Sequence, residues 1–161
     1  MEIRKARLED LDQLMDIFHT ARCFMRQNGN TRQWINGYPQ RELVVQDIEK
    51  GVCYVSVEDN SITGTFTLIE GDDPTYKVIR DGQWINDKPY GTIHRAASSG
   101  KKKGLFGEYV KWSFEKCGNL RADTHEDNKI MQHLLEKNGF KYCGIITVKN
   151  GTLRRAYQKI E

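Results

Sequence analysis

The residues from Tyr90 to Phe140 constrain the fold more than any other part of the chain, because strand-like and helical segments alternate there. Apolar and β-branched residues predict a strand, a turn rich in glycine and lysine follows, and hydrophobic residues then recur at helical spacing. The elements expected are a strand over 90–97, a helix over 104–117, a short strand over 120–123 and a helix over 127–138. A strand–helix–strand order implies a parallel crossover, so part of the sheet is expected to be parallel.

The rest of the chain predicts two N-terminal helices and a series of hairpins. Near Val52 the hydrophobic period changes from that of a helix to two. The further elements expected are a strand over 1–7, helices over 8–25 and 41–50, strands over 52–57 and 62–69, a hairpin of 76–80 with 83–85, and a hairpin of 140–148 with 152–160. Together they predict an α+β fold, in which helices cover both faces of a mixed, mostly antiparallel sheet.

Length and charge narrow the class of protein. The 161 residues fit a single domain spanning 1–161 that can bury a sizeable core. The net charge is only +3 and acidic and basic residues interleave, which argues against a bulk nucleic-acid or membrane-surface binder. No apolar run approaches the roughly 20 residues of a transmembrane helix, and the charged N-terminus is unlike a signal peptide.

Cysteine and histidine positions give no pattern of a metal site. The four cysteines are widely spaced, which predicts neither a zinc site nor a disulfide framework. His94 and His125 lie on neighbouring predicted strands, close to Asp123 and Asp127, but no ligand spacing connects them. We therefore expect no metal, and a reducing cytoplasm is the expected location.

A basic turn follows the strand over 90–97. It begins at Ser98, contains the run Lys101-Lys102-Lys103 and leads directly into a helix after Gly104. The free N–H groups of a helix start, together with three lysines, favour an anion and specifically a phosphate or pyrophosphate. The alternative is a solvated basic turn. A Walker A loop is excluded, because Leu105 follows Gly104 where that motif has a lysine.

Three stretches resemble the GNAT superfamily of acetyltransferases. Lys101-Lys102-Lys103-Gly104-Leu105-Phe106 resembles its pyrophosphate loop, whose usual form is Q/R-x-x-G-x-G/A. Residues 120–140 resemble its second motif, a strand and then an Asn that opens a helix ending in Gly-Phe, and residues 3–10 resemble its opening. The loop departs from the usual form at Lys101 and Phe106, and Leu135 stands where many members have the Tyr that protonates the leaving thiolate.

The resemblance implies that acetyl-CoA is the co-substrate and that an amine attacks its thioester directly. It places the thioester where the strands over 90–97 and 120–123 separate, with the backbone N–H groups of Ala96 and Ala97 polarising the carbonyl as an oxyanion hole. The cofactor-binding residues that it implies are Arg95, Ala96, Ala97, Lys101, Lys102, Lys103, Gly104, Leu105, Phe106, Asn128 and Met131.

Direct attack needs a base, because an amine is protonated at neutral pH. Glu70, at the end of its predicted strand, is the candidate general base, and Asp123 and Glu126 are weaker candidates. The alternative for Glu70 is a solvated charge at a strand end. Asn128 also has an alternative, since Asn commonly caps a helix without binding any ligand.

Four aromatic residues are candidates for contacting the acceptor. They are Trp34, Tyr38, Tyr76 and Trp84, in segments that face the acceptor side of the cleft in the GNAT fold. An aromatic lining can hold a cationic amine. The alternative is that these side chains pack their segments onto the sheet.

The predicted function is an N-acetyltransferase that acetylates a primary amine of a small molecule, a peptide or a protein. The alternative, motivated by Leu135, is a catalytically weak domain that binds acyl-CoA as a sensor or docking module. A nucleic-acid-binding module is a weaker third hypothesis, since neither a basic stripe nor stacking aromatics accompany residues 101–103. The final hairpin and the aromatic residues permit a homodimer, and no motif defines the acceptor.

Overall fold

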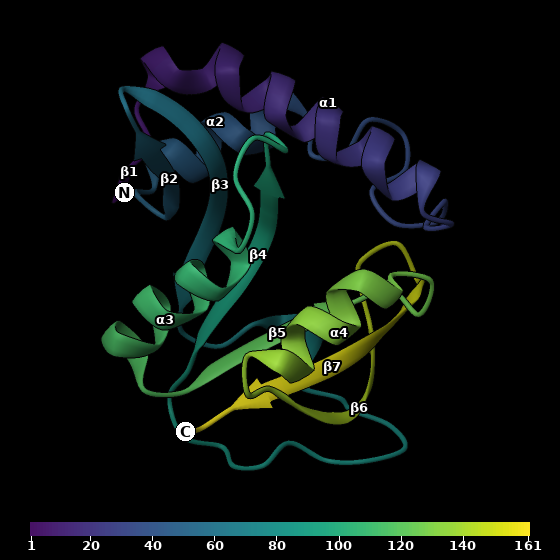
Figure 1. Ribbon diagram of the computed structural model, residues 1–161. Coiled ribbons are helices and arrows are strands. Elements are labelled where there is room, and N and C mark those ends of the chain that lie inside the picture. The colour runs from purple at the N-terminus through teal and green to yellow at the C-terminus, as the bar shows by residue number, and fades with distance from the viewer. The chain divides into compact units, whose positions relative to one another are not determined.

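The computed structural model describes all residues from 1 to 161 and contains seven strands and four α-helices (Figure 1). Two short 3-10 turns, Leu8–Asp10 and Pro74–Tyr76, supplement them. The elements in chain order are β1 (Glu2–Lys5), α1 (Leu11–Gln27), α2 (Arg41–Glu49), β2 (Cys53–Glu58), β3 (Ser61–Glu70), β4 (Gly91–Ser98), α3 (Leu105–Cys117), β5 (Leu120–Thr124), α4 (Lys129–Lys137), β6 (Lys141–Thr147) and β7 (Leu153–Lys159).

The strands form one mixed sheet in the order β1-β2-β3-β4-β5-β7-β6. The pairs β1–β2, β2–β3, β5–β7 and β6–β7 are antiparallel. The pair β4–β5 is parallel, as a strand–helix–strand connection requires, and α3 is the crossover. The predicted α+β class with a mixed, mostly antiparallel sheet is therefore confirmed.

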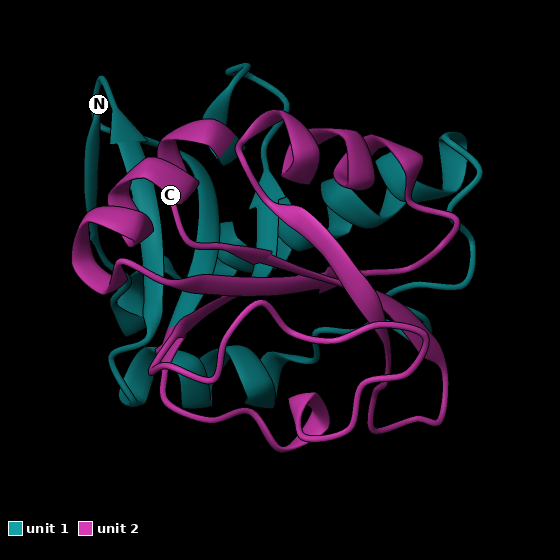
Figure 2. Cartoon of the chain, turned by 90° about the horizontal axis from the view of Figure 1, so that it is seen from below, with its two compact units in different colours: residues 1–68, 94–106 teal, residues 69–93, 107–161 magenta.

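The chain divides into two compact units (Figure 2). Unit 1 contains residues 1–68 and 94–106, and unit 2 contains residues 69–93 and 107–161. Each unit is built from two separate stretches of sequence. Strands β3 and β4 and helix α3 contribute residues to both units, because the boundaries fall within these elements.

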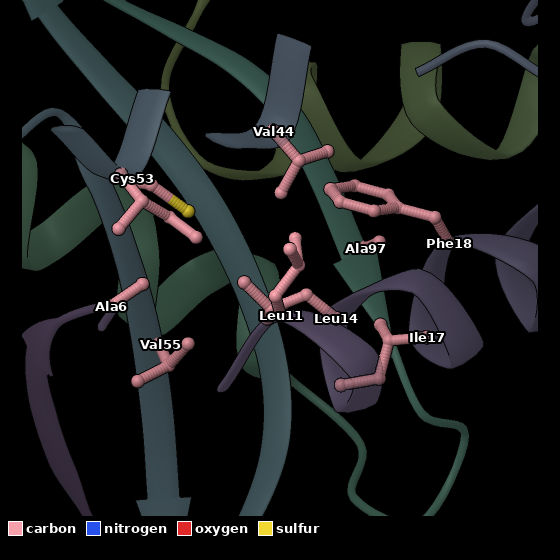
Figure 3. Close-up of a cluster of buried hydrophobic side chains, with 10 residues drawn as sticks. Ala6, Leu11, Leu14, Ile17, Phe18, Val44, Cys53, Val55 and Ala97 are labelled. Carbon is pink, nitrogen blue, oxygen red and sulfur yellow. The ribbon is translucent and has the colours of Figure 1, made fainter. Parts of the chain in front are cut away.

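The core of unit 1 forms where α1, α2 and β2 bury their apolar faces. Figure 3 shows the side chains that these elements, together with Ala6 and Ala97, bring into this cluster. The buried residues of α1 are Leu11, Leu14, Ile17 and Phe18, which follow the spacing of one helix face. The sequence predicted this helix from Leu8, whereas the structure has a 3-10 turn there and starts α1 at Leu11.

The core of unit 2 includes a second cluster of buried residues. It consists of Tyr76, Tyr90, Ile146 and Ala156, against which Ile79, Trp84 and Val148 pack. Tyr76 and Trp84 are in contact, with ring centroids 5.0 Å apart. The segment between β3 and β4 is therefore fastened to the sheet through its aromatic side chains.

The predicted hairpin of 76–80 with 83–85 is wrong. Arg80 instead pairs with Ile145 of β6, and each residue's N–H donates to the other's carbonyl oxygen at 2.8 Å. Gly82 lies against the same strand so closely that a Cβ there would stand 1.9 Å from the carbonyl oxygen of Cys143. Asp81-Gly82 does turn the chain, but the residues before it find their partner on β6, so no local hairpin forms.

Replacing Leu14 with alanine is expected to lower the free energy of unfolding by about 2–5 kcal/mol, the usual range for a buried leucine. Leu14 is 0% exposed in the core of unit 1, so truncation leaves a cavity. Denaturant unfolding followed by circular dichroism measures the loss. The matched control is Leu8→Ala, at a position 55% exposed, where a change within about 0.5 kcal/mol is expected. Equal losses at the two positions would contradict this core.

Candidate active site

The turn between β4 and α3 is fixed in shape by its backbone. Figure 1 shows the chain turning back after β4 before it enters α3. Gly100 and Gly104 have φ angles of +85° and +77°, a conformation that favours glycine, and α3 begins directly after Gly104. The N–H of Ser99 donates to the carbonyl oxygen of Thr63 on β3 at 2.9 Å, and the N–H of Gly100 donates to Oγ of Ser98 at 3.0 Å.

The three lysines of the turn have different surroundings. Lys102 donates to Glu58 at the end of β2, with Nζ 2.5 Å from Oε2, and this hydrogen bond lowers the pKa of the Glu58 carboxyl. Lys101 and Lys103 are exposed and form no ion pair. One lysine therefore anchors the turn to the sheet, while two leave their charge free for an anion.

The turn presents hydrogen-bond donors and positive charge of the kind that bind an anion. The first N–H groups of an α-helix have no partner within the helix, so those of Leu105 and Phe106 are available to an anion. A Cβ built at Gly104 would find no atom within 4 Å, so space lies beside this backbone. Side-chain charge, helix-start amides and open space are the features that a diphosphate site requires.

Strand β4 is kinked at Arg95, which has a φ angle of +50°. Its guanidinium makes a bidentate ion pair with Asp47 of α2, with Nε 2.8 Å from Oδ2 and Nη2 3.0 Å from Oδ1. Nη1 also donates to the hydroxyl of Tyr38 at 3.1 Å. Burial alone would lower the pKa of Arg95, but Tyr38 and Asp47 outweigh it and the pKa is raised. Ala96 and Ala97 follow directly, and Ala97 is buried in the core of unit 1.

Asn128 caps α4, as its alternative interpretation anticipated. Its Oδ1 accepts the N–H of Met131 at 3.0 Å. The preceding turn is held by Gln132, whose Nε2 donates to the carbonyl oxygens of His125 and Glu126 at 3.2 and 2.9 Å. Met131 is partly buried, and Leu135, one helical turn further on, is 1% exposed. The position that holds a tyrosine in many GNAT members is therefore filled here by a core residue.

Of the three carboxylates considered as bases, Glu70 and Asp123 differ most clearly in their surroundings. Glu70 is exposed at the end of β3, where the thiol of Cys117 approaches its Oε1 at 3.8 Å. The next residue pairs with Tyr90, so Glu70 lies beside the start of β4, whereas Ala96 and Ala97 lie near its end.

Asp123 of β5 is partly buried and is held by a phenol. Tyr76 donates its hydroxyl to Oδ2 of Asp123 at 2.7 Å. Burial raises the pKa of Tyr76 well above its ordinary value, and the charge of Asp123 raises it further. The phenol therefore stays protonated and keeps one carboxylate oxygen fixed.

The four predicted aromatic residues occur as two pairs. In unit 1, Trp34 lies 6.2 Å from Tyr38 and 5.7 Å from Phe18, measured between ring centroids. In unit 2, Tyr76 is buried against Trp84, which also covers the guanidinium of Arg121 at 4.0 Å. Packing therefore accounts for these aromatic contacts.

Two charged residues near these sites were missed by the sequence analysis. Asp47 lies on the buried face of α2 with Val44 and Ile48, and a carboxylate on an apolar stripe was the signal that could have revealed it. Arg121 alternates with buried apolar residues in β5 and stacks between Trp84 and Tyr90, at 4.0 Å from each ring. No local pattern predicts that stacking.

Two broader features of the molecule bear on its class. No group of three or more His, Cys, Asp and Glu side chains is arranged to hold a metal ion. Among the helices, none combines the length and the apolar character needed to cross a bilayer.

Replacing Asn128 with alanine is expected to destabilise the protein by about 1 kcal/mol, because the cap of α4 loses its acceptor. The change Asn128→Asp retains an oxygen at that position and is the matched control, with a smaller loss expected. Denaturant unfolding of the two variants measures the difference. Indistinguishable stabilities of the alanine variant and the wild type would contradict a capping role.

Comparison with known proteins identifies the family. No family model and no curated protein matches the sequence. Among solved structures, an acetyltransferase of the GNAT family from Streptococcus agalactiae is 36% identical, with 99% of this chain and 95% of that chain covered and a TM-score of 0.91. A putative acetyltransferase from Staphylococcus aureus is 26% identical, with coverages of 99% and 98% and a TM-score of 0.70. Aminoglycoside 6'-acetyltransferase type Ii is 16% identical at a TM-score of 0.63, with coverages of 99% and 96%, and shows a shared fold alone. The chain therefore belongs to the GNAT family of acetyltransferases.

Proposed function

We propose that this acetyltransferase moves the acetyl group of acetyl-CoA to a primary amine of a small molecule, a peptide or a protein. The junction of β4 and α3 carries the proposal, because it presents helix-start amides and two unpaired lysines at one turn. In a chain of the GNAT family, this chemistry fits a diphosphate-bearing acyl donor.

The proposed cofactor contacts follow from that junction. Lys101, Lys103 and the N–H groups of Leu105 and Phe106 would bind the diphosphate, while Lys102 holds the turn through Glu58. The backbone of Arg95, Ala96 and Ala97 would pair with the pantetheine. In unit 2, Asn128 and Met131 at the start of α4 are the further cofactor contacts that the family resemblance implies.

The chemistry proposed at the thioester is electrostatic. Bound acetyl-CoA supplies an acetyl thioester whose carbonyl carbon is attacked by the amine. The N–H groups of Ala96 and Ala97 would donate to the carbonyl oxygen as it becomes negative. The new C–N bond replaces the C–S bond, the sulfur leaves as a thiolate, and the proton that the nitrogen then loses passes to solvent or to that thiolate. Because a thiol has a pKa of only about 8.5, the sulfur can leave without a donated proton, so a buried Leu135 is compatible with turnover.

A carboxylate is proposed to take the proton that the ammonium must lose before attack. Glu70 lies beside the start of β4 rather than near Ala96 and Ala97, so it would act through solvent, and its exposure suits that relay. Asp123 is the second candidate, and the hydrogen bond from Tyr76 suits it to holding a cationic ammonium. The two roles predict different effects of substitution.

Reversal of the two free lysine charges, in Lys101→Glu with Lys103→Glu, is expected to weaken acetyl-CoA binding at least tenfold, or about 1.4 kcal/mol. The physical reason is the loss of two cations beside the diphosphate and their replacement by anions. Isothermal titration measures the affinity, with desulfo-CoA and ATP as additional ligands. Lys149→Glu, in the exposed turn between β6 and β7, is the charge-matched control and should bind like the wild type.

Unchanged affinity in the double variant would overturn the placement of the diphosphate. If the wild type binds acetyl-CoA but acetylates no member of an amine panel, the alternative function follows instead, namely an acyl-CoA sensor or docking module. The buried Leu135 is the feature that motivates this alternative.

Glu70→Gln is expected to lower kcat about 10²-fold near neutral pH if Glu70 is the base, the lower end of the usual contribution of such a group. The loss should shrink at high pH, because the amine is then deprotonated by solvent. Asp123→Asn should mainly raise KM for the amine if Asp123 binds the ammonium. A pH series of kcat and KM distinguishes these roles, and wild-type kinetics for both variants would reject both.

A further inference from the structure

Arg95 is the only residue other than glycine that has a positive φ angle within a strand. The other five such residues, which lie in turns or loops, are Trp34, Asn36, Asp59, Asn60 and Asp81. A left-handed backbone is unfavourable for arginine, because its Cβ crowds the following carbonyl oxygen. Some interaction elsewhere must therefore hold Arg95 in this conformation.

The kink adds a residue to β4. The N–H of Gly71, directly after β3, donates to the carbonyl oxygen of Tyr90 at 3.2 Å, and the N–H of Ser99 donates to the carbonyl oxygen of Thr63 at 2.9 Å. Between these two backbone contacts the chain advances eight residues from Thr63 to Gly71 but nine residues from Tyr90 to Ser99. One extra residue in one strand is the pattern of a β-bulge, which redirects the peptide groups that follow it.

The side chain of Arg95 is anchored where the backbone is kinked. Both carboxylate oxygens of Asp47 accept from it, and the side chains of Arg95 and Asp47 are only 11% and 7% exposed. Bidentate pairing fixes the plane of the guanidinium as well as its position. Nη1 of Arg95 also donates to the hydroxyl of Tyr38 at 3.1 Å, which connects the loop that carries Trp34 and Tyr38 to the same side chain.

We infer that Arg95 is a positioning residue whose ion pair with Asp47 keeps residue 95 left-handed and thereby sets the direction of the Ala96 and Ala97 N–H groups. The functional part of this inference rests on the proposed role of those two groups at the thioester. Tyr38 extends the same network to the loop that carries Trp34 and Tyr38, two of the predicted acceptor contacts. This loop and the kinked strand therefore share the buried side chain of Arg95.

A simpler role for Arg95 is to join α2 to β4 through a buried ion pair, with no bearing on the backbone that follows. Substitutions with glycine and with alanine distinguish the two roles, because glycine adopts positive φ angles readily and alanine does not. If Arg95 sets the backbone conformation, Arg95→Gly should retain activity that Arg95→Ala loses. If Arg95 only joins α2 to β4, both substitutions should lower activity equally.

The decisive comparison uses the double variants Asp47→Asn with Arg95→Gly and Asp47→Asn with Arg95→Ala. Both variants lack the ion pair, and neither leaves an unpaired carboxylate. The remaining difference between them is the backbone preference of the residue at position 95. We expect kcat of the glycine variant to exceed that of the alanine variant at least tenfold. Affinity for CoA should differ by a smaller factor than kcat, because the lysine turn still binds the diphosphate in both variants.

A second measurement does not require activity. The amide resonances of Ala96 and Ala97 in the free protein should stay near their wild-type positions in the glycine variant and move in the alanine variant. Arg95→Lys, which keeps the charge but loses the bidentate fork, is a milder single change. It should also shift these resonances and lower kcat by a larger factor than it changes KM for acetyl-CoA, which keeps a test available if the double variants do not fold.

The possible outcomes distinguish failure of the positioning role of Arg95 from failure of the proposed function. Equal kcat and equal Ala96 and Ala97 resonances in the glycine and alanine variants, with an active wild type, would overturn the positioning role alone. Failure of the wild type to bind acetyl-CoA would overturn the proposed function, while the resonances would still decide whether Arg95 sets the backbone.

Discussion

Backbone pairing along β4 determines how the chain must connect its strands and where the lysine turn lies. The strand is bonded to β3 on one side, and it pairs in parallel with β5 on the other through Gly91 and Thr92. Because two consecutive parallel strands need a crossover, the chain must return through α3. This return is what places the unpaired amides of a helix start directly after the lysine turn. The proposed anion site is thus a consequence of the sheet topology, and the lysines add charge to a geometry that the topology already requires.

Two buried polar pairs, one in each unit, involve residues with proposed roles, and each pair also fixes a conformation. Arg95 and Asp47 meet in a two-point contact in unit 1, where an unpaired charge would be costly to bury. In unit 2, the phenol of Tyr76 is bonded to Asp123. The first pair lies at a kinked strand that carries the proposed oxyanion donors, and the second holds a proposed amine-binding carboxylate. These two pairs therefore stabilise buried polar groups and also fix the orientation of residues with proposed catalytic or binding roles.

Aromatic residues illustrate how far residue type predicts a role. The sequence marked Trp34, Tyr38, Tyr76 and Trp84 as either acceptor contacts or packing residues. Their observed partners include the guanidinium groups of two arginines, Arg95 beside the Tyr38 hydroxyl and Arg121 against the ring of Trp84. These contacts give the aromatic residues a structural role in each unit. Contact of Trp34 and Tyr38 with an acceptor remains a prediction. Because Tyr38 is bonded to Arg95, such a contact would be connected to the kinked part of β4.

Local sequence patterns predict the order of most elements, the parallel crossover and the basic turn, because hydrophobic period, glycine and lysine are local signals. The sequence failed for residues 76–85, since the local hairpin signal at Asp81-Gly82 could not reveal that Arg80 pairs with Ile145. It named Asn128 at the start of its helix, but not the partners of Arg95. Those partners lie 48 and 57 positions away in the chain, at Asp47 and Tyr38, and the left-handed conformation depends on them. Only tertiary structure could decide these features, because side chains so distant in sequence meet after the sheet and helices have packed.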